Sequence, residues 1–212
     1  MTLFKQIWMG KSLARALMNK EATKYSVKGL VLDVGGGKST DYLSFLKGVE
    51  DAQITTVDLR IVGTGKSIDL ENDPLPFTNG AVDVVLLFNL LEHIYHYQNV
   101  VKETFRVLKK DGEIIGFVPF LVNYHPDPHD YFRYTKEALY KIFKEAGFSD
   151  IIICEIGHGP FAVNYNNIML SLPIFIRVLV FPIYYVADII ILFFRPRIKE
   201  RYPLGYFFRG IN

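Results

Sequence analysis

Short apolar runs alternate with segments of helical periodicity along most of the chain. The runs cover residues 29–33, 53–59, 81–88, 113–119 and 148–156, and each has the length of a buried strand. Segment 100–112 carries apolar residues at helical spacing and stops at a glycine, which predicts a helix between two of these strands. Strands that alternate with helices predict a three-layer α/β fold.

The pattern changes beyond position 158, where the chain becomes almost uniformly apolar. Residues 168–194 are long enough to span a bilayer, yet they include Arg177 and Asp188, which lie about three helical turns apart on one face. A single polar stripe along an apolar helix favours an element that lies in a membrane interface, or a hairpin broken near a proline, over a single membrane span. The alternatives are an apolar helical cover over a substrate cleft and a dimer interface.

Basic residues concentrate near both ends of the chain. Residues 1–26 interleave basic and apolar positions, which predicts a basic amphipathic helix that either packs on the domain or binds a membrane surface. After the apolar segment, only one acid opposes four basic residues, which are Arg195, Arg197, Lys199 and Arg201. Such a cluster favours anionic headgroups on the cytoplasmic side of a membrane.

Strand character returns at residues 202–209, which predicts the last strand of the sheet, beside 148–156. The apolar helical segment would then be an insertion before that strand. We therefore expect four parts: the N-terminal helix at 1–26, the main α/β domain at 27–158, the hydrophobic helical insertion at 159–201 and the last strand at 202–212.

Composition narrows the classes of function. The formal net charge is only +2, and no strand interleaves basic with aromatic residues, so we expect no nucleic-acid partner. Cys154 is the single cysteine, which excludes an internal disulfide and a thiolate zinc site and fits a reducing compartment. Because Cys154 lies in an apolar run, we expect a buried thiol rather than a nucleophile.

A glycine turn at residues 35–37 follows the first predicted strand and indicates a nucleotide-type site. Glycines remove the Cβ atoms that would hold a ligand away from the backbone. The phosphate-binding P-loop pattern would require a glycine at position 32, which is Leu32, and the dinucleotide fingerprint would require one at position 40, which is Thr40. Both patterns therefore fail.

Three carboxylates fall at or just past separate predicted strands. They are Asp33, Asp58 and Asp69. A lone Asp in such a place is more often a turn or capping residue than a ligand. Open α/β sheets, however, bind ligands outside the carboxyl ends of their strands, so three such residues together predict one site at this edge.

The order of these motifs resembles that of the class I S-adenosylmethionine-dependent methyltransferases, and of their small-molecule branch in particular. The resemblance covers about residues 27–156 and rests on Asp33, Gly35, Gly37, Asp58, Asp83, Val85, Leu91, Glu92, His93, Arg106, Val107, Leu108, Lys109 and Gly112. The third glycine of the family's first motif is Ser39 here. The resemblance implies a Rossmann-like three-layer sandwich around a mostly parallel seven-stranded sheet, whose domain at 27–158 binds S-adenosylmethionine.

The resemblance also implies which residues bind this cofactor. The carboxylate of Asp58 is expected to accept the ribose hydroxyls, and Asp69 is expected to meet the adenine amino group. The complete expected set is Asp33, Gly35, Gly36, Gly37, Asp58, Leu59, Asp69, Leu70 and Asn89.

The loop at 120–135, after the fifth predicted strand, is expected to supply the acceptor side of the site. Methyl transfer from a sulfonium needs an in-line nucleophile and exclusion of water, and a hydroxyl acceptor benefits from a base. We expect catalytic roles for His125, His129 and Asp130, and substrate-binding roles for His93, Tyr131 and Arg133. The alternative is that the loop residues only brace the loop and cap the next helix, and that His93 is structural.

No metal is expected at this loop. His125 and His129 have a spacing that could place both on one helical face, but Pro126 and Pro128 prevent a regular helix between them.

Together these features predict S-adenosylmethionine-dependent methyl transfer to a small or lipid-linked acceptor at the cytoplasmic face of the membrane. A role in cell-surface glycan or lipid biosynthesis would fit, with the protein peripheral or monotopic on the inner face. A non-catalytic, membrane-attached scaffold with the same fold is the alternative. A nucleotide-dependent oxidoreductase ranks third, because its last glycine is absent.

Overall fold

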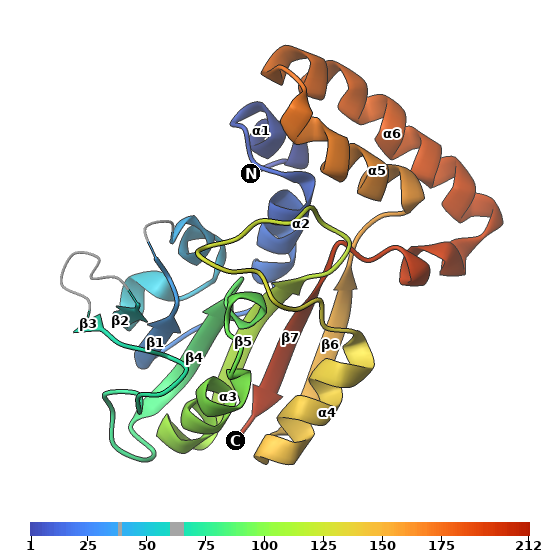
Figure 1. The fold of residues 1–212 in the computed structure, drawn as a ribbon. Helices are drawn as coiled ribbons and strands as arrows, with labels where there is room; N and C mark the ends of the chain where they lie inside the picture. Colours follow the sequence, from blue (N-terminus) through green and yellow to red (C-terminus); the bar gives the residue numbers. More distant parts are fainter. Residues whose placement is uncertain (38–39, 60–65) are drawn as a thin grey trace.

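A seven-stranded sheet forms the centre of the protein (Figure 1). The computed structural model describes residues 1–37, 40–59 and 66–212, so Ser39 lies outside the described residues. The strands are β1 (Leu30–Val34), β2 (Gln53–Asp58), β3 (Lys66–Ser67), β4 (Val82–Phe88), β5 (Leu108–Pro119), β6 (Ser149–Ile156) and β7 (Gly205–Ile211). Their order in the sheet is β3-β2-β1-β4-β5-β7-β6.

The sheet is parallel from β3 to β5, and β7 runs antiparallel to both of its neighbours. β7 pairs with β5 along its whole length and with β6 on its other side. The chain leaves the sheet after β6, forms the apolar helical segment and returns as the strand that fills the gap between β5 and β6. The predicted mostly parallel seven-stranded sheet, with a helical insertion before the last strand, is confirmed.

Helices cover both faces of the sheet and complete three layers. Because successive residues of a strand point to opposite faces, Val31 and Leu32 enter different hydrophobic clusters. On one face α3 (Tyr97–Val107) and α4 (Lys136–Ala146) pack on the strands, for example through Leu139. On the other face lie α2 (Leu13–Ala22) and η1 (Asp41–Phe45), with Met18 in the core.

A third hydrophobic cluster joins the N-terminal helix to the insertion, beside the carboxyl edge of the sheet (Figure 1). It contains α1 (Leu3–Trp8), α5 (Pro160–Ile168) and α6 (Ile174–Phe194), and its buried members include Ile7, Tyr165 and Phe181. The remaining short helices are η2 (Val49–Asp51), η3 (Leu91–His93), η4 (Met169–Ser171) and η5 (Pro196–Arg201).

The polar stripe of α6 faces the protein rather than a membrane surface. Asp188 is fully buried and accepts the backbone N–H groups of Phe161 (3.0 Å) and Ala162 (2.7 Å), so it caps the first turn of α5. Arg177 donates from Nε to the Leu172 carbonyl at 2.6 Å. The spacing of these two residues predicts a shared face correctly, but that face packs on α5, and the opposite, apolar face is exposed.

Two helices replace the single N-terminal helix that the sequence predicts. The chain turns at Gly10, whose φ of +84° lies in the left-handed region that favours glycine. The hydroxyl of Ser12 then accepts the N–H of Arg15 at 3.1 Å and caps α2. Both helices pack on the domain, which is one of the two alternatives for this segment.

Two further expectations need correction. The helix expected at 100–112 ends at Val107, because Leu108 is buried as the first residue of β5 and pairs with Val82. The register of the β4–β5 pair then shifts, so that Glu113 lies opposite Val84, and the residues between form a bulge in β5. Cys154 is half-buried rather than fully buried, and burial raises the pKa of its thiol.

Candidate functional site

A cavity of about 720 Å³ opens at the carboxyl ends of β1, β2 and β4. This volume is within the range of sites that hold drug-sized ligands. All of the residues predicted to bind the cofactor, except Asp33, line this cavity. They are Gly35, Gly36, Gly37, Asp58, Leu59, Asp69, Leu70 and Asn89. The structure thus brings together residues from four separate segments of the chain.

The glycine turn forms the floor of the cavity, and its geometry requires glycine at two positions. Gly35 has φ of +73°, and a Cβ there would lie 2.4 Å from a methyl carbon of Leu90. A Cβ at Gly36 would lie 2.1 Å from Oδ2 of Asp33. The backbone therefore stays bare where a ligand can approach it closely.

Asp33 lies behind this turn and not on the cavity wall. It is fully buried, and the hydroxyl of Tyr42 donates to its Oδ1 at 2.5 Å. Burial raises the pKa of Asp33 to about 6, and the hydrogen bond from Tyr42 acts in the opposite direction. Its other oxygen, Oδ2, has no hydrogen-bond partner among the described residues.

Asp58 presents its carboxylate to the cavity from the end of β2, and Asp69 does so from the loop after β3. Oδ2 of Asp58 accepts the N–H of Gly37 at 3.2 Å, which ties the end of β2 to the glycine turn. Asp69 accepts the side-chain amide of Asn72 (2.8 Å) and the N–H of Glu71 (3.0 Å). The hydrogen bond from Asn72 is the main cause that lowers the pKa of Asp69, and the bond from Glu71 adds to it. The carboxylate of Asp69 is therefore ionised at neutral pH.

The N-terminal helices supply a wall that the sequence did not reveal. Lys11, Ser12 and Arg15 line the cavity. Lys11 forms an ion pair with Asp41 at 2.5 Å, and the guanidinium of Arg15 lies 5.3 Å from the ring centroid of Tyr42. The basic, apolar pattern of 1–26 predicted a packed or membrane-bound helix, but it carried no signal for a place at this site.

The loop at 120–135 divides the predicted acceptor residues into two groups. His125 and His129 line the cavity, as does His93 from η3. Asp130, Tyr131 and Arg133 do not line it. The expected direct roles of these three residues in catalysis and substrate binding therefore have no support from their positions.

Asp130 and Arg133 instead brace the loop, which is the alternative that the sequence left open. Nη2 of Arg133 donates to Oδ2 of Asp130 at 2.7 Å, and the same carboxylate accepts the N–H of His125 at 2.9 Å. Arg133 also donates to the carbonyls of Phe132 (2.9 Å) and Asn123 (3.3 Å). The guanidinium is the main cause that lowers the pKa of Asp130 to about 2.

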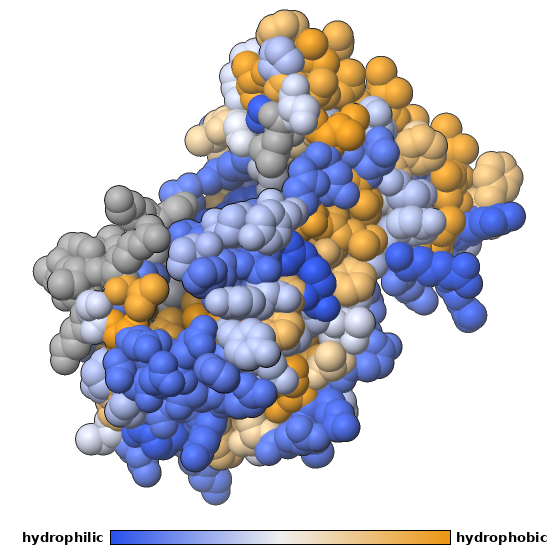
Figure 2. Space-filling model, viewed as in Figure 1, coloured by the Kyte–Doolittle hydropathy of each residue, from blue (hydrophilic) through white to orange (hydrophobic). Residues whose placement is uncertain are grey.

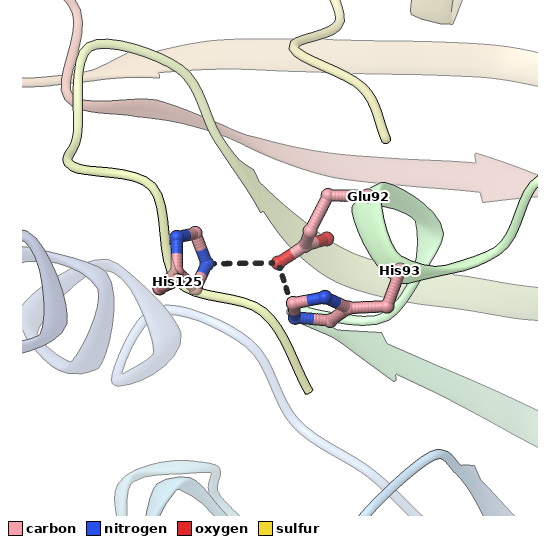
Figure 3. A group of neighbouring side chains, drawn as sticks. All are labelled: Glu92, His93 and His125. Carbon is pink, nitrogen blue, oxygen red and sulfur yellow. Dashed lines mark ion pairs between the residues drawn. The ribbon is translucent and has the colours of Figure 1, made fainter. Parts of the chain in front are cut away.

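Glu92, His93 and His125 form a compact cluster at the cavity wall (Figure 3). Oε1 of Glu92 lies 3.6 Å from Nε2 of His93 and 3.8 Å from Nε2 of His125. The Glu92 side chain is fully buried, and this carboxylate is the main cause that raises the pKa of His125. The backbone carbonyl of Glu92 accepts the N–H groups of Tyr131 (2.7 Å) and Phe132 (3.3 Å), which fixes the loop against η3.

Comparisons with known proteins agree with this architecture. Residues 32–116 match the model of a family described as methyltransferase domain. Over 92 residues the chain is 29% identical to a probable S-adenosylmethionine-dependent methyltransferase of Mycobacterium tuberculosis, in two strains. The match covers 41% of this chain and spans only about a third (34%) of the length of those curated relatives.

Solved structures share the fold over nearly the whole chain. A methyltransferase from Archaeoglobus fulgidus, described as dependent on S-adenosylmethionine, superposes with a TM-score of 0.62 at 14% identity, covering 99% of this chain and 98% of that chain. Phosphoethanolamine N-methyltransferase 2 of Haemonchus contortus, in complex with S-adenosylmethionine, gives 0.58 at 16% identity, covering 92% and 52%. At these identities the structural likeness shows the fold.

Proposed function

We propose that this chain is a class I S-adenosylmethionine-dependent methyltransferase, and that it transfers a methyl group from this cofactor to a small or lipid-linked acceptor at a membrane surface. One observation carries the enzymatic part of the proposal. The bare glycine turn and the carboxylates of Asp58 and Asp69 line a single cavity at the carboxyl edge of the sheet.

The residues of this cavity fit S-adenosylmethionine. The Asp58 carboxylate stands where it can accept two ribose hydroxyls, and the glycine backbone admits the ligand without a Cβ in the way. Asp69 offers a charged acceptor to an exocyclic amino group, and the buried Leu70 offers an apolar contact to an adenine ring. When bound, the cofactor would supply an electrophilic methyl group on its sulfonium.

The protein's own residues would orient the acceptor and exclude water. The loop at 120–135 covers the carboxyl edge of the sheet (Figure 1) and is held by the Asp130–Arg133 ion pair. His129 lies on the cavity wall and is the candidate base for a hydroxyl acceptor. A fixed loop and a positioned base supply the orientation that an in-line displacement needs.

The membrane part of the proposal rests on the exposed face of α6. Among the described residues this helix is the one that is long and apolar enough to cross a membrane, judged by length and composition. Figure 2 shows apolar residues along its outer side. Its most exposed apolar side chains are Phe175, Leu179, Ile183, Phe193 and Phe194, and Leu179 is 72% exposed. Each such side chain removed from water contributes about 1.5–3 kcal/mol.

Neighbouring segments extend this face and add positive charge. Phe4 and Trp8 of α1 are exposed beside α6. The end of α6 leads into η5, with Arg195, Arg197, Lys199 and Arg201. Apolar side chains next to basic ones favour an anionic lipid surface, which supports the proposal of a peripheral or monotopic enzyme on the cytoplasmic face of a membrane.

The cavity is linked to the same helical layer, which supports a lipid-linked acceptor. The side-chain amide of Asn123, in the acceptor loop, donates to the carbonyl of Asn167 in α5 at 2.8 Å. On the other side of the cavity, Lys11 and Ser12 lie in the connection between α1 and α2. An acceptor headgroup would therefore reach the cavity between elements that pack on the membrane-facing helices.

Calorimetric titration with S-adenosylmethionine and S-adenosylhomocysteine tests the central claim. We expect both to bind, and Asp58→Ala to weaken binding by about 1.5–3 kcal/mol, because it removes a charged acceptor of hydrogen bonds. Asp51→Ala, which removes an exposed carboxylate from η2, is the matched control and should leave binding unchanged. Binding of neither ligand by the wild-type protein would favour the non-catalytic scaffold instead.

A further inference from the structure

Three potential ligand atoms, from Glu92, His93 and His125, meet at one end of the cavity. In Figure 3 the imidazole rings of His93 and His125 point toward the same oxygen of Glu92. Their ligand atoms all lie within 4.8 Å of one another. Glu92 and His93 are neighbours in η3, whereas His125 comes from the loop after β5, so the fold and not a local motif assembles the group.

In the neutral form of each ring, the hydrogen bonds direct a lone pair of the inner nitrogen toward Glu92. Nδ1 of His93 lies 2.5 Å from the carbonyl oxygen of His129, and Nδ1 of His125 lies 2.8 Å from that of Asn123. A carbonyl only accepts, so in the neutral rings the hydrogen is on Nδ1 and the lone pair is on Nε2. Nη2 of Arg133 also approaches Nδ1 of His125, but at 3.4 Å, and we assign the tautomer from the shorter contact.

Glu92 adds a buried negative charge to these two lone pairs. Its side chain is fully buried, and neither carboxylate oxygen has a hydrogen-bond partner among the described residues. Arg133, from the same loop as His125, is already paired with Asp130. A divalent cation between these two lone pairs and the carboxylate would compensate the buried charge, which is costly when it is left unpaired.

We propose that Glu92, His93 and His125 bind a divalent transition-metal ion, whose open coordination position takes an oxygen atom of the acceptor. Two imidazole nitrogens and one carboxylate are a ligand set used by catalytic zinc and by non-haem iron. Ligands about 2.0–2.2 Å from one ion lie up to about 4.4 Å apart, so shifts of a few tenths of an ångström close the site. The contacts of both Nδ1 atoms with backbone carbonyls are the outer hydrogen bonds that such histidines have.

The position of the proposed ion at the cavity wall suggests that it binds the acceptor. His93 and His125 line the same cavity as the cofactor residues, so an ion between them has free positions on the cavity side. A bound hydroxyl would be polarised and held there by the ion. This second part rests on the proposed methyltransferase function and restricts the acceptor to molecules with an oxygen donor, whereas the metal site itself does not depend on that function.

Titration of the metal-free protein with Zn²⁺ and Co²⁺ tests the site directly. We expect one ion per chain, and a loss of affinity of at least about 100-fold in Glu92→Gln and in His125→Ala, since even outer-shell changes cost 10–100-fold. His96→Ala removes an exposed histidine near the cluster that is not one of its ligands, and it should bind the ion as the wild type does. The visible spectrum of bound Co²⁺ should respond to acetohydroxamate, a bidentate oxygen ligand, if a coordination position is open.

The outcomes separate this inference from the proposed function. Failure to bind either ion stoichiometrically, or binding that survives both ligand variants, would overturn the metal site. A Co²⁺ spectrum that ignores acetohydroxamate would overturn the open position. Binding of S-adenosylmethionine is measured on the same samples and should persist in His125→Ala, which lies on a partly exposed loop and preserves the test if Glu92→Gln does not fold.

Discussion

At the scale of single residues, the buried carboxyl of Asp33 shows how the site shapes the chain around it. Its Oδ2 occupies the space where any Cβ at Gly36 would lie, so the two residues are dependent on each other. Its pKa is raised to about 6, mainly by burial, although the Tyr42 hydroxyl donates to Oδ1. Carrying this charge near neutral pH therefore reduces stability.

The substitution Asp33→Asn tests this cost. The pKa of Asp33 is higher in the folded chain than in the unfolded chain. The contribution of Asp33 to stability is therefore fully present below its pKa in the unfolded chain, and it is lost as the pH rises through about 6. The asparagine keeps an oxygen for Tyr42 but does not titrate. The free energy of unfolding of the variant, relative to wild type, should therefore be higher at pH 8 than at pH 5 by about 1 kcal/mol.

Urea unfolding of both proteins at the two pH values measures this difference. Asp51→Asn, which alters an exposed carboxyl, is the control for general effects of charge. A gap between Asp33→Asn and wild type that is the same at pH 5 and pH 8 would show that Asp33 is not the titrating group.

At the scale of elements, the helical insertion depends on one buried cap. Asp188, in the second turn from the end of α6, accepts two N–H groups at the start of α5, and Gly159 makes room for it because a Cβ there would lie 2.4 Å from Oδ1. An acceptor at a helix N-terminus also interacts favourably with the helix dipole. One residue thus joins α6 to the start of α5.

Asp188→Ala should consequently destabilise the protein by about 2 kcal/mol, because it leaves one buried and one part-buried donor without an acceptor. Asp188→Asn keeps one acceptor oxygen and should cost less. Hydrogen exchange should become faster at Phe161 and Ala162 in particular. Unchanged exchange at these two amides would mean that the cap contributes nothing, and Glu200→Ala, an exposed acid beyond α6, provides the reference.

Sequence patterns predicted the elements well and their contacts less well. Apolar runs and the glycine turn located β1, β2 and β4, and the strand-end rule placed Asp58 and Asp69 at one cavity. Helical periodicity showed that Arg177 and Asp188 share a face, but periodicity does not state what that face packs against. The meeting of Glu92 with His125 depends on the path of a loop with two prolines, and no local spacing encodes it.

At the scale of the whole molecule, one side carries the exposed apolar face of α6 (Figure 2), and the acceptor loop is hydrogen-bonded to the same helical layer. This loop also contributes His125 and His129 to the wall of the cavity. The polar groups of the layer are used internally, by Asp188 and Arg177, so its outer side is free to be apolar. Water, lipid or a second copy of the chain can cover this face. The basic residues of η5 next to it favour lipid, because they would repel their own copies in a symmetric dimer.

Sedimentation with liposomes distinguishes these coverings. We expect the protein to pellet with vesicles that contain phosphatidylglycerol, and the double variant Leu179→Asp/Ile183→Asp to lose binding by at least 100-fold, since each side chain contributes about 1.5–3 kcal/mol on burial. Tyr140→Asp, at an exposed aromatic residue of α4, is the matched control and should still pellet.

Liposome binding that salt weakens but does not abolish would indicate that α6 inserts into the lipid, in addition to the attraction of the basic residues to headgroups, because salt screens exposed charges beyond about 10 Å at 0.1 M. A protein that ignores liposomes and elutes as a dimer, which the double variant converts to a monomer, would assign the apolar face to a second copy of the chain and overturn the membrane proposal.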